Sequence, residues 1–403
     1  MKHIKYFEEK ALYDNYISNE PILPNVSYTQ DTNQVFYNPL ISNNNDYSDW
    51  VHLTYRVNDP TQPVDIFCSR DFGMGEDFTF NITKVTDMMV VEADEPIAVT
   101  PTYQYTFSSI GDHTVYVKFE DMTNIPMLSF TICTSLVDLQ LPLSIKSIGF
   151  GAFQGCTGLT ELKLNKGFEV LGAFSFFGCT NLQKVFIPKT LNNCELADAG
   201  PFGDTIISDI VFEEGILSIP QILFKMCKEL KHIDIPSSVI NIEFNAFSYS
   251  GLTEITIPDS VTKIGQGAFL NCEDLVKIVV PNSINEIGTG AFSGCLKLTE
   301  INIPEQITSI PDRMLLGSGI EEIIIPEQII NIGEDVFKNC TKLEKITSLA
   351  TTAPTIMDDT FPGIKSNGTL IVPEGCTNAY SSWMNTSSHY LGYYKWTIQE
   401  LAE

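Results

Sequence analysis

The feature that most constrains the fold is a segment of about 23 residues that recurs along most of the chain. The stretches 257–281 and 280–304 repeat one pattern, and an aromatic or aliphatic residue marks the centre of each copy. Successive centres lie 22 to 24 residues apart, except around an irregular unit near Phe202. The centres are Phe130, Phe153, Phe176, Phe202, Phe224, Phe247, Phe269, Phe292, Leu315, Phe337 and Phe361. A fixed period of this length predicts a solenoid of about eleven stacked units.

Two further columns keep the same register. Five residues before the centre stands an apolar residue: Ile125, Ile148, Leu171, Ile219, Ile242, Ile264, Ile287, Ile310, Ile332 or Ile356. Three residues after it stands a cysteine in seven units: Cys133, Cys156, Cys179, Cys227, Cys272, Cys295 and Cys340. Within a unit, the segment 252–258 predicts a short strand that ends at Pro258, because proline cannot donate to a sheet ladder. The Gly-Ala-Phe segment before the cysteine predicts a helical turn with its phenylalanine inward.

The ten cysteines allow a metal, a disulfide or a buried-thiol interpretation. No C-x-x-C pair occurs, which argues against zinc. The period places Cys133, Cys156 and Cys179 on neighbouring coils, so disulfides remain possible, but buried thiols also behave as small hydrophobes. We expect a reduced, buried ladder and no metal or other cofactor. Three cysteines, Cys68, Cys194 and Cys376, lie outside the ladder.

The repeated string I-P-x-S-V-x-x-I-G-x-x-A-F-x-x-C-x-x-L-x-x-I resembles the BspA-type leucine-rich repeats of bacterial surface proteins. The segment 369–383, followed by Trp-Thr-Ile-Gln-Glu-Leu, is similar to the closing cap of that family. The resemblance covers about residues 122–403 and implies a curved solenoid that binds host proteins, matrix or other cells. It supplies no catalytic residues. The unit at 189–215 departs from the pattern.

Residues 46–121 carry no repeat and alternate apolar and polar residues between turn signals. The expected strands are 51–57, 63–68, 78–85, 88–93, 103–109 and 113–119. The end of this region resembles the last two strands of immunoglobulin-like sandwiches. We expect a small immunoglobulin-like β domain here; as an alternative, the region caps the first coil.

Residues 1–45 are rich in asparagine and proline after a short amphipathic start. They are read either as a flexible leader or as an anchoring arm that becomes ordered on another chain. In the second case the aromatic anchors are Tyr6, Phe7, Tyr13, Tyr16, Phe36 and Tyr37. The expected chain is mainly β with short helical turns, divided into an arm (1–45), the immunoglobulin-like domain (46–121), the leucine-rich-repeat solenoid (122–368) and a cap (369–403).

The net charge of −26 argues against nucleic acid and anionic membranes as partners. It favours simple solubility, with a cation-requiring surface as the alternative. No apolar run is long enough to span a bilayer, and the first residues lack the apolar core of a signal peptide. No H-E-x-x-H or G-x-S-x-G motif is present, so we expect no enzyme activity.

Each repeat strand presents two outward positions. The charged column contains Asp138, Glu161, Lys184, Asp209, His232, Glu254, Lys277, Glu300, Glu322 and Lys345. The mixed column contains Gln140, Lys163, Phe186, Val211, Asp234, Thr256, Val279, Asn302, Ile324 and Thr347. The sheet face of a solenoid is a usual binding surface. The partner-binding residues are therefore expected among Phe186, Val211, Asp234, Thr256, Val279, Asn302 and Ile324.

Three functions remain in competition. The first is a surface recognition or adhesion protein that binds a protein or glycan, located outside the cell or on its surface. The second is a decoration or fibre protein of a phage virion, assembled through the N-terminal arm. The third is an enzyme whose site carries no known motif. The repeat resemblance favours the first, and the missing signal peptide favours the second.

Overall fold

The computed structural model describes residues 26–28, 35–37, 47–69, 80–357 and 359–401. Within these residues the chain is almost entirely β, with three short 3₁₀ helices: η2 (Ile82–Lys84), η3 (Thr377–Tyr380) and η4 (Leu391–Tyr394). No helix in the described part is long and apolar enough to cross a bilayer. The chain divides into two compact units. The first holds the described residues up to 197 with 204–214, and the second holds 198–203 with 215–401.

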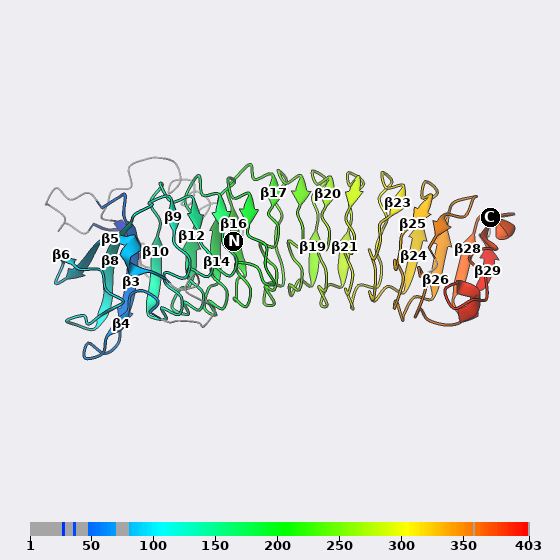
Figure 1. Ribbon diagram of the computed structural model, residues 1–403. Helices are drawn as coiled ribbons and strands as arrows, with labels where there is room; N and C mark the ends of the chain where they lie inside the picture. Colours follow the sequence, from blue (N-terminus) through cyan, green and yellow to red (C-terminus); the bar gives the residue numbers. More distant parts are fainter. Residues whose placement is uncertain (1–25, 29–34, 38–46, 70–79, 358, 402–403) are drawn as a thin grey trace. The chain divides into compact units, whose positions relative to one another are not determined.

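The first unit begins with a five-stranded antiparallel sheet of order β10-β3-β8-β5-β6 (Figure 1). Its strands are β3 (Val51–Val57), β5 (Val85–Glu92), β6 (Glu95–Val99), β8 (Gly111–Phe119) and β10 (Leu136–Gln140). Two separate pairs are β1 (Val26–Tyr28) with β2 (Val35–Tyr37), and β4 (Val64–Asp65) with β7 (Gln104–Tyr105). The immunoglobulin-like prediction is not confirmed, because the long strands form one sheet that continues into β10 of the first repeat.

The N-terminal sheet covers the open end of the first coil. In β3, Leu53 pairs with Leu139 of β10. The ring of Phe67 stacks on Phe130, the first residue of the phenylalanine column, with 5.2 Å between ring centroids. This contact shields the apolar core of a coil that has no preceding neighbour in the repeat.

Several details of the N-terminal region differ from the sequence predictions. Of the expected strands 63–68 and 103–109, only Val64–Asp65 and Gln104–Tyr105 form strands. Residues 80–84 of the expected strand 78–85 form a loop and η2. The side-chain oxygen of Asn81 accepts a hydrogen bond from the backbone amide of Thr83, and this local bond competes with strand pairing. The strand β6 was not predicted, since Glu95 and Pro96 are typical of turns. It lies at the sheet edge, where proline is tolerated.

The repeats of the first unit form two separate ladders of parallel strands (Figure 1). The short ladder contains β9 (Asn124–Ile125), β11 (Ser147–Ile148), β13 (Val170–Leu171) and β15 (Asn193–Cys194). The long ladder contains β12 (Glu161–Lys163), β14 (Lys184–Ile187) and β16 (Asp209–Phe212). Cys194 pairs with Leu171, so it occupies the apolar column of the irregular unit. In that unit Phe202 follows the column residue by eight positions, whereas the centre of a regular unit follows it by five.

The second unit continues the same pattern of two ladders. Its short strands are β17 (Ser218–Ile219), β18 (Asn241–Ile242), β20 (Lys263–Ile264), β22 (Glu286–Ile287), β23 (Ser309–Ile310), β25 (Asn331–Ile332) and β27 (Thr355–Ile356). Its long strands are β19 (Glu254–Thr256), β21 (Lys277–Val279), β24 (Glu322–Ile325), β26 (Lys345–Ser348), β28 (Thr369–Val372) and β29 (Thr397–Glu400). The predicted solenoid of about eleven coils is therefore confirmed.

The predicted closing cap seals the last coil of the second unit. Trp383 is fully buried, lies 5.7 Å from the ring of Phe361, and donates from Nε1 to the carbonyl of Pro354. Tyr380 donates to the carbonyl of Ala350. Both large side chains therefore bury apolar area while their polar atoms find backbone partners.

The core of each coil is its central phenylalanine. Every residue of that column is fully buried, including Leu315. Adjacent rings are nearly parallel, as between Phe269 and Phe292, whose centroids are 5.5 Å apart at 4°. Backbone bonds link the same turns, because the Phe269 amide donates to the carbonyl of Ala291 in the next coil. The predicted helical turns are hydrogen-bonded turns rather than continuous helix.

We expect Phe269→Ala to lower the free energy of unfolding by about 3–5 kcal/mol, as for other buried aromatic residues. The substitution removes stacking on both Phe247 and Phe292. Chemical denaturation followed by circular dichroism measures the change. Unaltered stability would contradict an inward phenylalanine column.

Close packing between coils predicts a contrast between two glycines. A Cβ at Gly172 would lie 2.4 Å from the carbonyl carbon of Gly149 in the preceding coil. At Gly178, φ is +70° but a Cβ would meet no atom within 4 Å. We therefore expect Gly172→Ala to cost about 3 kcal/mol through overpacking, and Gly178→Ala about 1 kcal/mol through left-handed strain. Equal losses for the two variants in urea unfolding would argue against backbone contact at Gly172.

Candidate binding face

The long strands expose one face in each unit, and the two outward columns lie along it. In the second unit the register is fixed by pairing: Thr256 lies beside Val279, and Ile324 beside Thr347. Inward residues of the same strands, such as Ile278 and Ile323, are buried. Burial alternates along β19, β21 and β24 and so separates a core column from the outward columns, whereas in β26 Ile346 and Thr347 are both buried.

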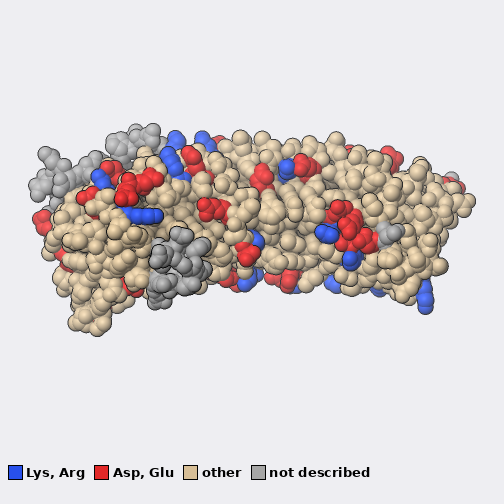
Figure 2. Space-filling view, viewed as in Figure 1, with Lys and Arg blue, Asp and Glu red and all other residues tan. Residues whose placement is uncertain are grey.

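The charged column is a solvated surface with local ion pairs. Lys345 lies 2.9 Å from Glu322 of the neighbouring coil, and Lys184 lies 3.4 Å from Asp209. The Lys184 side chain is mostly buried, but Lys345 and Glu322 are both exposed, and an exposed pair contributes little to stability. Figure 2 shows basic and acidic side chains interspersed over the visible face rather than gathered by sign.

The first-unit part of the mixed column differs from its prediction. Phe186 and Val211 were expected to face water, but they are only 4% and 6% exposed. They lie side by side in register. The ammonium groups of Lys163 and Lys184 lie 5.5 Å and 4.9 Å from the centroid of the Phe186 ring. Neighbouring long side chains thus cover the aromatic ring, which removes both residues from the candidate binding surface.

The second-unit part of the mixed column is exposed from Asp234 to Ile324, whereas Thr347 is buried. Val279 is 56% and Ile324 57% exposed. Asp234 and Thr256 are also exposed, and Asp234 accepts a hydrogen bond from His232. Asn302 bonds through its side-chain amide to both backbone groups of Val280, so it links two coils in addition to facing outward. Val279 and Ile324 are therefore the apolar side chains of this column segment that meet solvent.

Sequence reasoning missed one member of this column. Ile371 in β28 pairs with Thr347 and is half-buried. It was assigned to the cap, yet its strand continues the long ladder. The period would have revealed it, since Ile371 follows Thr347 by 24 residues.

The predicted arm residues cannot be placed. Tyr6, Phe7, Tyr13 and Tyr16 lie outside the described residues, and for Phe36 and Tyr37 only the backbone pairing of β2 with β1 is described. The anchoring role of the arm stays a prediction.

The cysteine ladder is buried and reduced, as predicted. All seven ladder cysteines lie in the core as thiols rather than disulfides, and so do Cys68 and Cys194. Each thiol from the second coil onward donates to the carbonyl of the preceding centre, as Cys179 does to Phe153 at 3.1 Å and Cys272 to Phe247 at 3.1 Å. Burial raises the pKa of the Cys272 thiol to about 12 and that of Cys340 to about 11. The ladder thiols therefore remain protonated donors at neutral pH.

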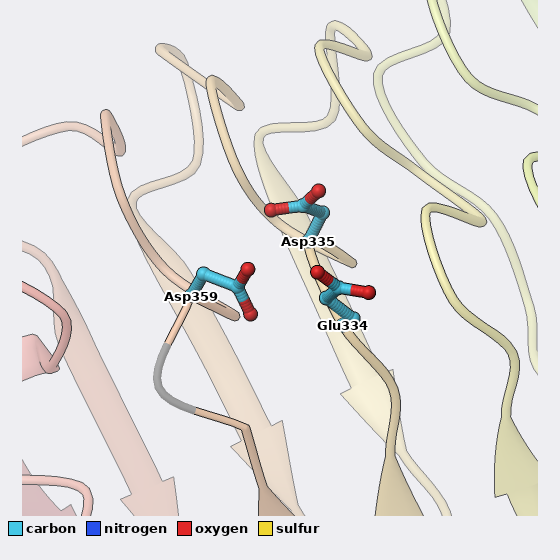
Figure 3. A group of neighbouring side chains, drawn as sticks. All are labelled: Glu334, Asp335 and Asp359. Atoms are coloured by element: carbon cyan, nitrogen blue, oxygen red, sulfur yellow. The ribbon is translucent and has the colours of Figure 1, made fainter.

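One acidic cluster was not predicted from the sequence. Glu334, Asp335 and Asp359 bring three carboxylates together from neighbouring coils, and Figure 3 shows them turned toward one another. Asp335 and Asp359 hold the same position, two residues before Phe337 and Phe361, so the period contained this signal.

The cluster is neutralised by basic side chains. Asp335 accepts from Lys338 Nζ at 2.7 Å and from Arg313 Nε at 3.2 Å. Burial raises the pKa of Asp335, but the hydrogen bonds from Lys338 and Arg313 outweigh it, so its pKa lies below the ordinary value. Both carboxylate oxygens of Asp335 are thus already engaged, and the cluster is better explained as an ion-pair network than as a metal centre.

Comparison with known proteins identifies the repeat. A family model described as a BspA-type leucine-rich repeat region, in six copies, matches residues 100–198, 197–319 and 308–391. No curated protein matches the chain.

Several solved leucine-rich-repeat proteins are similar to it. One from Bacteroides ovatus is 25% identical, with 71% of each chain covered and a TM-score of 0.42. Another from Eubacterium ventriosum is 19% identical, with 62% of this chain and 72% of that chain covered and a TM-score of 0.40. A leucine-rich-repeat protein of T. pallidum is 24% identical, with 50% and 72% covered and a TM-score of 0.31.

The structure makes a prediction for thiol chemistry. Because the thiolate is the reactive form, burial and a raised pKa should make Cys156, Cys272 and Cys295 react slowly with thiol reagents under native conditions. The half-buried Cys376 should react first and serves as the internal control. Intact-mass spectrometry after timed labelling measures the order. Disulfide-linked ladder residues, or labelling of all ten cysteines at one rate, would contradict this assignment.

Proposed function

The chain belongs to the BspA-type leucine-rich-repeat family, and from this premise we propose that it is a non-enzymatic recognition protein of a bacterial surface. Its role is adhesion to a protein or a glycan on another surface. The binding face is the exposed second-unit part of the mixed column, from Asp234 to Ile324. Its location is the cell surface or the space outside the cell.

The observation that carries this proposal is the exposure of Val279 and Ile324 on a strand face. Both are aliphatic side chains more than half exposed, at positions where the register turns them away from the core. The core does not require an apolar residue there, since Ile278 and Ile323 already fill the inward positions. A partner that covers the column gains their burial, about 1 kcal/mol for each half-exposed side chain.

The surroundings of the two residues favour recognition over simple aggregation. Charged side chains flank them in the neighbouring column, including Lys277, Glu300 and Glu322. A small apolar centre with a polar rim is the usual anatomy of a specific interface. Charged rims also oppose non-specific association of a chain with a net charge of −26.

The experiment compares matched variants on defined surfaces. Wild-type protein, the double variant Val279→Lys/Ile324→Lys and the control Ile330→Lys are applied to a glycan array and to a panel of immobilised extracellular-matrix proteins. Ile330 is 62% exposed but lies outside the mixed column, directly before β25. We expect wild type and the control to bind a member of these panels. The double variant should bind about thirtyfold more weakly, which corresponds to about 2 kcal/mol.

The control distinguishes a weaker binding surface from a destabilised protein. All three proteins should melt at similar temperatures, because the substituted side chains are on the surface. Binding that survives the double substitution would place the interface elsewhere. Absence of wild-type binding to every glycan and matrix protein would contradict the adhesion role.

A further inference from the structure

We propose that the C-terminal edge of the long ladder binds a second copy of this chain, through antiparallel pairing of β29 with the β29 of the partner copy. The strand β29 is the last member of the sheet β24-β26-β28-β29, and among the described residues no strand pairs with its other edge. The proposal concerns this backbone edge and is independent of the face that carries Val279 and Ile324.

The pairing of β29 with β28 fixes which of its backbone groups point away from the ladder. The amides of Thr397 and Leu401 donate to carbonyls of the preceding coil at 3.0 and 2.8 Å. Alternate residues of a parallel strand bond to the same neighbour, so Thr397, Gln399 and Leu401 face β28. The amide and carbonyl groups of Ile398 and Glu400 therefore point outward, where no backbone group of the described residues bonds to them.

The cap covers the apolar core at this end but leaves the backbone edge open. The side chains of Thr397, Gln399 and Glu400 are exposed, and Leu401 is 39% exposed. A charged side chain at an edge is one device that opposes pairing. The carboxylate of Glu400 is instead held by its own coil, because it accepts a hydrogen bond from Thr377 Oγ1 at 2.8 Å.

The N-terminal sheet shows the contrasting case of a closed edge. Its last strand, β6, follows a two-residue turn in which Ala93 and Asp94 both have positive φ. Such a turn makes Glu92 and Glu95 a hydrogen-bonded pair, so the backbone of the next residue, Pro96, points outward. Proline has no amide hydrogen to offer there, and this blocks strand addition. The strand β29 contains no proline.

One register suits two antiparallel copies of β29. Pairing of Ile398 with the partner's Glu400, and the reverse, forms two complete pairs with four backbone hydrogen bonds in all. It places Gln399 opposite its own counterpart and brings no like charges together. A register that places Glu400 opposite its counterpart opposes two carboxylates, which is unfavourable, and one centred on Ile398 leaves a single complete pair. The strand is therefore complementary to itself, which favours a second copy as the occupant.

The contact is small, so the expected association is weak. Stable complexes bury about 1,200 Å² or more, and one pair of short strands covers far less. Each copy also carries a net charge of −26, so the two copies repel each other. We expect a dissociation constant of about 0.3 mM at high salt. Association should strengthen as salt rises from about 0.05 M to about 0.5 M, because salt screens the repulsion.

The first test reverses charges at the centre of the pairing. Sedimentation velocity compares wild type, Gln399→Lys, Gln399→Glu and an equimolar mixture of the two variants. The controls are Gln306→Lys and Gln306→Glu, which make the same changes of charge at an exposed residue outside β29.

At a total concentration of about 0.3 mM and high salt, we expect about half of the wild-type chains to be paired. Each Gln399 variant alone should associate at least about threefold more weakly, because like charges face each other across the pair. The mixture should recover wild-type association, and the Gln306 variants should resemble wild type. A monomeric wild type, or a mixture that pairs no better than its components, would overturn the proposal.

The second test traps the pair covalently in a Cys376→Ser background, which removes the one half-buried thiol. In the proposed register the two Gln399 Cα atoms lie about 4.5 Å apart, within disulfide range. Thr397 lies opposite the partner's Leu401, so its counterpart is about 13 Å away. With oxidised glutathione, Gln399→Cys should form an interchain disulfide and Thr397→Cys should not, as measured by intact mass. Equal crosslinking at both positions, or none at Gln399, would contradict this register.

Discussion

The structure depends on the fact that no coil can bury its own apolar face or satisfy its own buried turn. The Phe153 amide donates to Ser175 of the next coil, and the Phe153 carbonyl accepts from the thiol of Cys179. Both backbone groups of Phe153 are therefore engaged by the next coil. Stability within each unit is accordingly a sum of contacts between adjacent coils, and the ends of the stack need special covering.

The same requirement explains why cysteine recurs in the core. The position three residues after the centre needs a small group that tolerates burial and can donate to a carbonyl, and a thiol meets both conditions. Where cysteine is absent, Ser250 and Ser318 take its place and contact the thiols of Cys272 and Cys340. The raised pKa of the thiols follows from this burial, so the cysteines are better understood as structural donors than as nucleophiles.

Periodicity made the solenoid and its inward columns predictable, because every inward position recurs with a fixed period. The N-terminal sheet was less predictable: β6 contains Pro96, and the pairing of β3 with β10 joins residues more than 80 positions apart. For the candidate site, the sequence predicted which residues share a column but not how exposed their side chains are. Sequence placed Phe186 and Val279 in one column, yet only the sizes and directions of neighbouring side chains decide that Phe186 is covered and Val279 is not.

This division between inward and outward positions also explains where specificity can reside. The core columns accept few residue types, because each side chain must pack on two neighbouring coils. The exposed members of the mixed column, such as Thr256, Val279 and Ile324, are under no such restriction. An outward residue can therefore change without disturbing the stack, and its neighbour one coil away remains about 4.8 Å distant. The core columns therefore fix the spacing of the coils, while the exposed outward residues leave the stability of the stack largely unchanged.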